Sequence, residues 1–152
     1  MMTKRIQENL ENKVKDYASK VRDRVQQVRK MQPNKKHSIY DYPGCVVACS
    51  YKNTKPVVKE SGSCDVSYYT NQLLIAKLND LRKDTKRPNG IGGESNLCKN
   101  VIGFCAEPKA AELVLRVYHT GNFSDMHFSK AYRPRTSKRM NYCPNCKKVF
   151  SI

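Results

Sequence analysis

The sequence predicts an α/β fold of three layers, in which helices flank a mixed central sheet. Two observations predict it: apolar residues recur at helical spacing over 3–32, 70–84 and 105–118, and β-branched apolar runs lie between and after these segments. A chain of 152 residues is long enough to bury such a core. We divide it into an N-terminal basic amphipathic helix, residues 1–36, and one domain, residues 37–152.

The first predicted element is a helix over residues 3–32. Lysine, arginine, glutamate and glutamine occupy most of its other faces, and Pro33 and Asn34 end it. We expect its apolar stripe to pack on the core; a coiled-coil arm and a basic helix that follows phosphates are the alternatives. The stripe consists of Ile6, Leu10, Val14, Tyr17, Val21, Val25 and Val28.

The next predicted elements are a β-hairpin and a second helix. Apolar runs at 44–51 and 56–60, joined by the polar segment KNTK, predict the hairpin that leads the sheet. Residues 65–69 fit either a strand extension or a loop. A helix follows over 70–84, capped by Thr70. Its expected buried residues are Leu73, Leu74, Ala76, Leu78 and Leu81.

The second half of the chain starts with a long glycine-rich loop at 85–103, and loops of this length are often functional. We then predict a helix over 105–118 and a strand over 126–132. A basic loop follows at 133–142. The segment CPNCKKVF, which starts at Cys143, begins a final helical turn.

The charge is strongly positive: 29 lysines and arginines stand against 13 acidic residues, a net charge of +16. This excess favours a polyanionic partner, nucleic acid first, while a solvated basic surface is the alternative. The chain has no run of 18 apolar residues, so we expect no membrane partner; we also expect a monomer. The N-terminus MMTKRIQENL has no apolar signal region. If a signal peptide has been removed, we expect a secreted or delivered effector. If none was present, we expect the protein in the cytoplasm or nucleus.

Cysteines at two predicted helix starts are the main chemical signal. Cys143-Pro-Asn-Cys146 is a CxxC pair, which serves zinc binding, disulfide exchange or a plain disulfide. Cys105 and Glu107 lie in the first turn of the 105–118 helix. Three thiolate ligands from Cys105, Cys143 and Cys146 would leave zinc one open position, the pattern of catalytic zinc sites. A carboxylate beside that position, Glu107, could move protons.

These two motifs resemble the signature of the cytidine-deaminase-like superfamily. That signature is H-x-E followed by P-C-x-x-C, with cysteine permitted in place of the histidine. The chain reads C-A-E at 105–107 and C-P-N-C at 143–146, with Pro144 inside the pair rather than before it. The segments FCAEPKAAEL and YCPNC are similar to the deaminase domains of bacterial polymorphic toxins and of related secreted animal deaminases.

The resemblance implies a three-layer deaminase fold and a zinc-dependent cytosine deaminase. Cys105, Cys143 and Cys146 would hold the zinc, and Glu107 would shuttle protons without binding the metal. Water activated by zinc would attack C4 of cytosine and leave uracil, although relatives attack C6 of adenine. The substrate we expect is cytosine in nucleic acid, with single-stranded DNA favoured and RNA possible.

Substrate contacts are predicted from residue type and position. A flipped base needs aromatic faces, polar groups and cations for phosphates. Tyr68, Tyr69 and Phe104 are further aromatic candidates, for which core packing is the alternative. The substrate-binding residues we select are Asn96, Asn100, Tyr132, Arg133, Arg135, Lys138, Arg139 and Tyr142.

Two other functions stay open at this point. Cys98 could complete a closed four-thiolate zinc module that binds nucleic acid without catalysis. A deaminase of free nucleosides or nucleotides would use the same metal site, but it gives the charge of +16 no role. The cysteines outside the predicted site could form two disulfides or remain reduced; these are Cys45, Cys49, Cys64 and Cys98.

Overall fold

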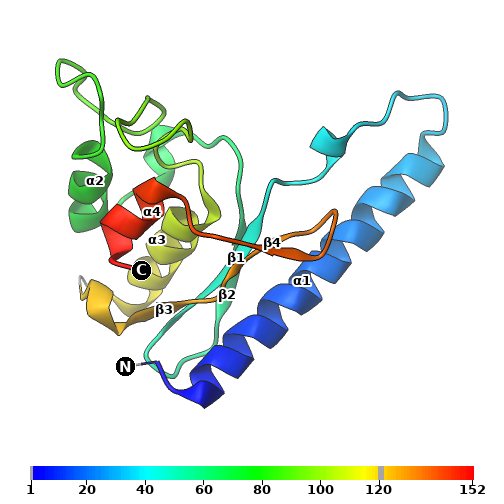
Figure 1. The fold of residues 1–152 in the computed structure, drawn as a ribbon, viewed down its shortest axis with the longest axis horizontal. Helices are drawn as coiled ribbons and strands as arrows, with labels where there is room; N and C mark the ends of the chain where they lie inside the picture. The colour runs from blue at the N-terminus through cyan, green and yellow to red at the C-terminus, as the bar shows by residue number, and fades with distance from the viewer. Residues whose placement is uncertain (1, 120–121) are drawn as a thin grey trace.

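The fold has three layers, a sheet with helices on both faces (Figure 1). The computed structural model describes residues 2–119 and 122–152. Helix α1 (Lys4–Met31) covers one face of the sheet, and α3 (Ala106–Tyr118) covers the other. The shorter helices α2 (Gln72–Asn79) and α4 (Pro144–Phe150) pack beside α3. The predicted α/β class and its three layers are therefore confirmed.

The sheet has five strands in the order β2-β1-β4-β5, and β3 also pairs with β1. Every pairing among the described strands is antiparallel, so the mixed sheet that we expected is not formed. The reason is that the chain returns to β1 at its Tyr51 end, where Met126 is the partner. The strands are β1 (Val46–Tyr51), β2 (Val57–Glu60), β3 (Met126–Phe128), β4 (Ala131–Arg133) and β5 (Lys138–Met140).

Strand β1 is buried on both faces and joins the two halves of the core. Successive side chains of a strand point to opposite faces. Val46 and Ala48 therefore pack in the cluster under α1, while Val47 and Cys49 pack in the larger cluster with α2, α3 and α4. This double burial explains why the segment reads as a continuous apolar run rather than an alternating one.

Helix α1 buries the predicted stripe except at Tyr17, which is half-buried, and at its C-terminal end. The Thr3 hydroxyl accepts a hydrogen bond from the Ile6 N–H and caps the helix. Val28, expected inside, is 48% exposed. The stripe packs on the sheet, as we expected, rather than forming a coiled-coil arm or a basic helix that follows phosphates. The buried apolar residues of α1 are Ile6, Leu10, Val14, Ala18, Val21 and Val25.

The predicted strand at 126–132 is divided into β3 and β4. Ser129 interrupts the ladder because its hydroxyl, rather than a backbone carbonyl, accepts the hydrogen bond from the Ala48 N–H at 2.9 Å. The next N–H, of Lys130, donates to the Glu11 carboxylate of α1 at 3.0 Å. The chain then continues into the β4–β5 hairpin, where the sequence predicted only a basic loop.

Three short 3₁₀ helices complete the described chain: η1 (Ile39–Asp41), η2 (Val66–Tyr68) and η3 (Phe123–Asp125). Residues 65–69 are therefore neither a strand nor an open loop. Helix α2 is shorter than predicted, and Asn71 caps it rather than Thr70. Leu73, which we expected to be buried, is exposed.

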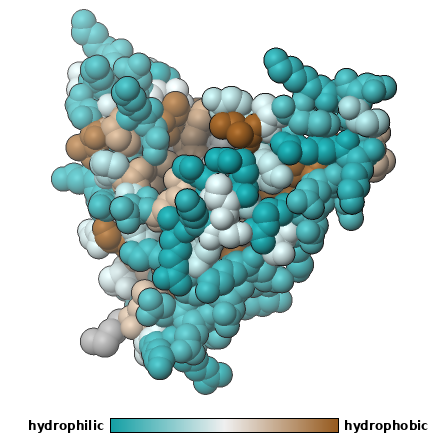
Figure 2. All heavy atoms as spheres, turned by 45° about the vertical axis from the view of Figure 1, so that its right-hand side comes forward, coloured by the Kyte–Doolittle hydropathy of each residue, from teal (hydrophilic) through white to brown (hydrophobic). Residues whose placement is uncertain are grey.

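The side of the molecule that carries α1 is mainly hydrophilic (Figure 2). Figure 2 brings forward the side of the molecule that carries α1, and hydrophilic side chains cover most of it. Within residues 2–119 and 122–152, no helix combines the length and apolar character that a membrane crossing requires.

Candidate metal centre and adjoining cleft

Two helix starts bring three cysteines together. Cys105 is the N-cap of α3 and Cys143 the N-cap of α4, and both have extended backbone with φ near −70°: −67° and −70°. Cys146 lies in the first turn of α4 and is buried. The Cys105 thiol makes no capping hydrogen bond with α3, whereas the Cys143 thiol is hydrogen bonded to Cys146 of α4.

The three sulfurs have the spacing of a thiolate metal site. The Cys105 and Cys143 sulfurs are 3.5 Å apart, and so are those of Cys143 and Cys146. All three lie within 4.8 Å of one another. Zinc bonds thiolate sulfur at about 2.3 Å, so a tetrahedral site separates sulfurs by about 3.8 Å. The donor set and its spacing therefore fit zinc.

The cluster contains three ligand residues rather than four. Among residues 2–119 and 122–152, no other histidine, cysteine, aspartate or glutamate belongs to this group. Cys98, the fourth ligand of the closed alternative, lies outside it, so that ligand set is not assembled. The glutamate of the motif, Glu107, is also outside the group, which agrees with a role other than metal ligand.

Glu107 is buried in the first turn of α3, beside the sulfurs. It is 3% exposed, and burial raises the pKa of its carboxyl to about 7. The charge of Cys143 raises this pKa further, whereas hydrogen bonds from the Glu107 backbone N–H and the Cys146 thiol oppose the shift. The N-terminus of α3 also favours a carboxylate at this position.

The thiols do not titrate alike. The pKa of the Cys143 thiol is lowered by its hydrogen bonds with Cys105 and Cys146. The hydrogen bond with Cys143 raises the pKa of Cys105, and hydrogen bonds with Cys105 and Cys143 raise the pKa of Cys146.

A hydrogen-bond chain, buried at Ser95 and Asn145, holds the preceding loop against the cluster. Asn145, inside the CPNC motif, donates from Nδ2 to the Asn100 carbonyl at 3.1 Å and accepts from the Ser95 hydroxyl at 2.5 Å. The Asn100 side-chain amide donates to the Cys105 sulfur at 3.8 Å. Asn145 and Ser95 were missed by the sequence analysis. The only sequence signal for Asn145 was its place between the predicted ligands Cys143 and Cys146.

An open cleft of about 410 Å³ adjoins Cys105. The predicted residues Asn100 and Arg133 line it, together with the aromatic candidate Phe104. Lys99 adds a second cation to the lining. The cleft thus combines an amide, an aromatic ring and two cations beside the sulfur cluster.

The other predicted substrate residues lie elsewhere. Tyr132 is 5% exposed and packs in the cluster under α1, on the opposite face of the sheet, so it offers no stacking face. Its hydroxyl accepts from Arg139 Nε at 2.9 Å, and Arg139 also pairs with Glu11 at 3.5 Å. Both residues therefore secure α1 to the sheet.

Arg135 and Lys138 are exposed at the turn of the β4–β5 hairpin, and Asn96 is exposed in the loop before Cys105. None of the three lines the cleft. The turn is directed toward α1, because its Pro134 carbonyl accepts from Arg22 at 3.1 Å.

Tyr142 lies close to the cluster but faces the core. Its hydroxyl donates to the Ser129 carbonyl at 2.7 Å, and its ring packs against the larger core cluster. Burial, followed by the nearby charge of Glu107, raises its pKa. The Lys130 ammonium lies 5.1 Å from the ring centroid. Tyr142 thus connects β3 to the start of α4.

All seven cysteines are free thiols in the structure, so the two possible disulfides outside the site are not formed. Cys45 lies at the edge of the cleft, where burial and then the charge of Glu107 raise its pKa to about 11.

Comparison with protein-family models, with curated proteins and with solved structures finds no match to this chain.

Proposed function

We propose that this protein is a zinc-dependent deaminase that converts cytosine to uracil in single-stranded nucleic acid, with DNA favoured over RNA. One observation carries the proposal: three cysteine sulfurs lie within 4.8 Å of one another, and the buried Glu107 lies beside them in the same helical turn as Cys105. The resemblance of C-A-E and C-P-N-C to the cytidine-deaminase-like superfamily is part of this proposal.

Cys105, Cys143 and Cys146 would hold the zinc ion. When bound, zinc supplies Lewis acidity that makes water a nucleophile near neutral pH. A fourth cysteine ligand is absent from the group in the described part of the chain, which favours an open coordination position.

Glu107 moves the protons of the reaction. Its carboxylate takes one proton from the attacking water and delivers it to N3 of the cytosine ring. It then takes the remaining hydroxyl proton and delivers it to the exocyclic amine, so that the C4–N bond breaks and ammonia leaves. Cytosine and water thus become uracil and ammonia, and Glu107 returns to its starting state.

The cleft beside Cys105 supports a nucleic-acid substrate. Lys99 and Arg133 are exposed there and can contact phosphates, while Asn100 can hydrogen bond with a base or ribose. The net charge of +16 favours a polyanion over a free nucleoside, which carries no phosphate.

The test is to incubate the zinc-loaded protein with single-stranded DNA and RNA oligonucleotides and to sequence the products for C-to-U and A-to-I changes. We expect C-to-U conversion by the wild type. Glu107→Gln, which keeps the side-chain size, should lower conversion about a hundredfold or more while still binding zinc.

Two cysteine variants complete the design. Cys143→Ser should lose zinc, whereas Cys98→Ser, a half-buried cysteine outside the cluster, should retain it. Full zinc binding without any conversion of DNA, RNA or free nucleosides would contradict the proposal and favour a non-catalytic zinc module that binds nucleic acid.

A further inference from the structure

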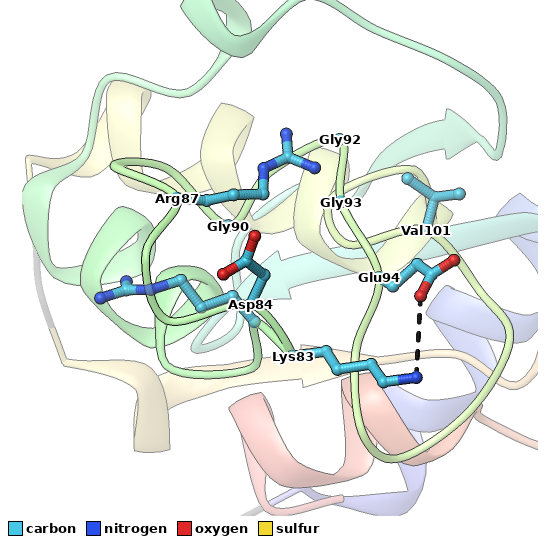
Figure 3. A pocket seen from close by; sticks show the side chains of 9 residues that line it. Lys83, Asp84, Arg87, Gly90, Gly92, Gly93, Glu94 and Val101 are labelled. Atoms are coloured by element: carbon cyan, nitrogen blue, oxygen red, sulfur yellow. Dashed lines mark ion pairs between the residues drawn. The ribbon is translucent and has the colours of Figure 1, made fainter.

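A second cleft, of about 500 Å³, lies in the loop between α2 and α3. Figure 3 shows the loop curving around it, with Lys83, Asp84, Arg87 and Glu94 along its lining. The ammonium of Lys83 points to the carboxylate of Glu94, at 3.9 Å. Both side chains of this pair are exposed, and their opposite charges add no net charge to the cleft.

Two arginines of this cleft remain without a carboxylate partner. In the described parts of the chain, no carboxylate oxygen lies within 4.0 Å of the guanidinium nitrogens of Arg82 or Arg87. Arg82 donates one hydrogen bond to the Asn79 carbonyl at 3.2 Å, and its buried Nε has no partner. The planar fork of an arginine suits the oxygens of a phosphate group.

The absence of a side chain at Gly93 lets Arg87 lie close to the loop backbone. In Figure 3 the Arg87 guanidinium extends toward Gly92 and Gly93. A Cβ atom at Gly93 would lie 2.6 Å from an Arg87 guanidinium nitrogen, too close for both to keep their places. The glycine therefore helps to set the position of this cation.

The second cleft adjoins the cleft beside the cysteine cluster. Val101 lines both of them. The first cleft contributes Lys99 and Arg133, and the second contributes Arg82 and Arg87. The two pairs of cations thus line two clefts that share Val101, as expected of a path for a chain of phosphates.

We propose that Arg82 and Arg87 form a phosphate site for the strand that carries the target base, one or more nucleotides away from the base held beside Cys105. The inference rests on the proposed function, because that function identifies the ligand as a single strand. It places phosphate binding in the α2–α3 loop, whereas the sequence analysis placed it in the 133–139 segment.

The experiment measures the binding of a fluorescent single-stranded DNA of about 12 nucleotides, and of a trinucleotide, at several salt concentrations. Arg87→Ala should weaken binding of the longer strand several-fold. It should also lower the slope of log affinity against log salt by about 0.7, the value for one phosphate contact on a single strand. The trinucleotide should lose much less affinity.

Gly93→Ala is the decisive variant because it moves the Arg87 guanidinium and changes no charge. We expect Gly93→Ala to weaken binding of the longer strand as well. Lys86→Ala is the matched control: it removes one exposed cation from the same loop, outside the cleft lining. Asp84→Asn removes a carboxylate from the lining and should strengthen binding.

Two results would overturn the phosphate site. The first is an equal loss of affinity for the longer strand in Arg87→Ala and Lys86→Ala. The second is unchanged binding in Gly93→Ala together with an unchanged salt slope in Arg87→Ala. This binding measurement needs no turnover. Failure of the deaminase proposal would appear separately, as an absence of uracil in both the trinucleotide and the longer strand.

Discussion

Two glutamates of α3, Glu107 and Glu112, are both buried but have different surroundings. The Glu112 carboxylate accepts hydrogen bonds from the N–H groups of Thr70 and Asn71 and contacts Arg116 at 3.6 Å. Within the described residues, the hydrogen-bond partners of Glu107 are its own N–H and the Cys146 thiol. The Glu112 carboxylate is therefore committed to the fold, and the fewer contacts of Glu107 agree with the proton transfer that we propose for it.

Substitution of Glu112 tests the first of these roles. Glu112→Ala leaves two N–H groups without their acceptor before α2, and we expect the free energy of unfolding to fall by about 2–3 kcal/mol. Glu112→Gln keeps an oxygen acceptor and should lower the free energy of unfolding by less. Urea unfolding measures both values, and an Ala variant as stable as the wild type would exclude the structural role.

At the scale of elements, the site depends on how the loop before α3 is attached to α4. Asn145 bridges Ser95 and the Asn100 carbonyl, and Asn100 donates to the Cys105 sulfur. Hydrogen bonds around metal ligands orient them and adjust the affinity of the site. The loop and the two helix starts should therefore act as one unit in metal binding.

Asn145→Ala removes both bridging hydrogen bonds, and we expect the zinc affinity to fall about tenfold or more. Competition with a chromophoric chelator measures it. The matched control is Asn141→Ala, which changes an exposed asparagine just before the same helix. Equal zinc affinities in the two variants would show that Asn145 has no role in the metal site.

Elements with strong periodicity were predictable from the sequence, and those set by individual polar contacts were not. The stripe of α1, the β1–β2 hairpin and the start of α3 at Cys105 follow the predicted pattern. The β4–β5 hairpin was missed because Lys138-Arg139-Met140 has no apolar alternation. The break at Ser129 depends on one side-chain hydrogen bond with a distant strand.

The same limit applies to the site. The spacing of Cys105, Cys143 and Cys146 at two helix starts was enough to predict a cluster, which the structure forms. Most of the substrate residues were chosen by their proximity in sequence to Cys143, and Asn96 and Asn100 were chosen by their proximity to Cys105. Tyr132 and Arg139 contact α1 instead, because alternate residues of β4 and β5 point to opposite faces of the sheet.

At the scale of the whole molecule, α1 is a structural layer of the fold. It covers the face of the sheet that presents Val46, Ala48 and Tyr132. Glu11 of this helix also holds the Lys130 N–H at the break between β3 and β4. The cysteine cluster lies on the opposite face, so α1 supports the site through the sheet.

Leu10→Ala tests this layer. Leu10 is 0% exposed, and its truncation should lower the free energy of unfolding by about 2–5 kcal/mol. Val28→Ala, at an exposed position of the same stripe, should change it by about 0.5 kcal/mol or less. Thermal or urea unfolding measures both variants, and similar losses in the two would mean that α1 does not pack as described.

The central claim is a metal centre with three sulfur ligands and one open position beside Glu107. X-ray absorption spectroscopy of the zinc-loaded protein tests it most directly, because sulfur and oxygen neighbours differ in distance from zinc. Wild type and Cys98→Ser should both show three sulfur atoms and one oxygen or nitrogen atom. Four sulfur atoms in the wild type and three in Cys98→Ser would contradict the claim, since Cys98 would then close the site and the protein would be a zinc-binding scaffold.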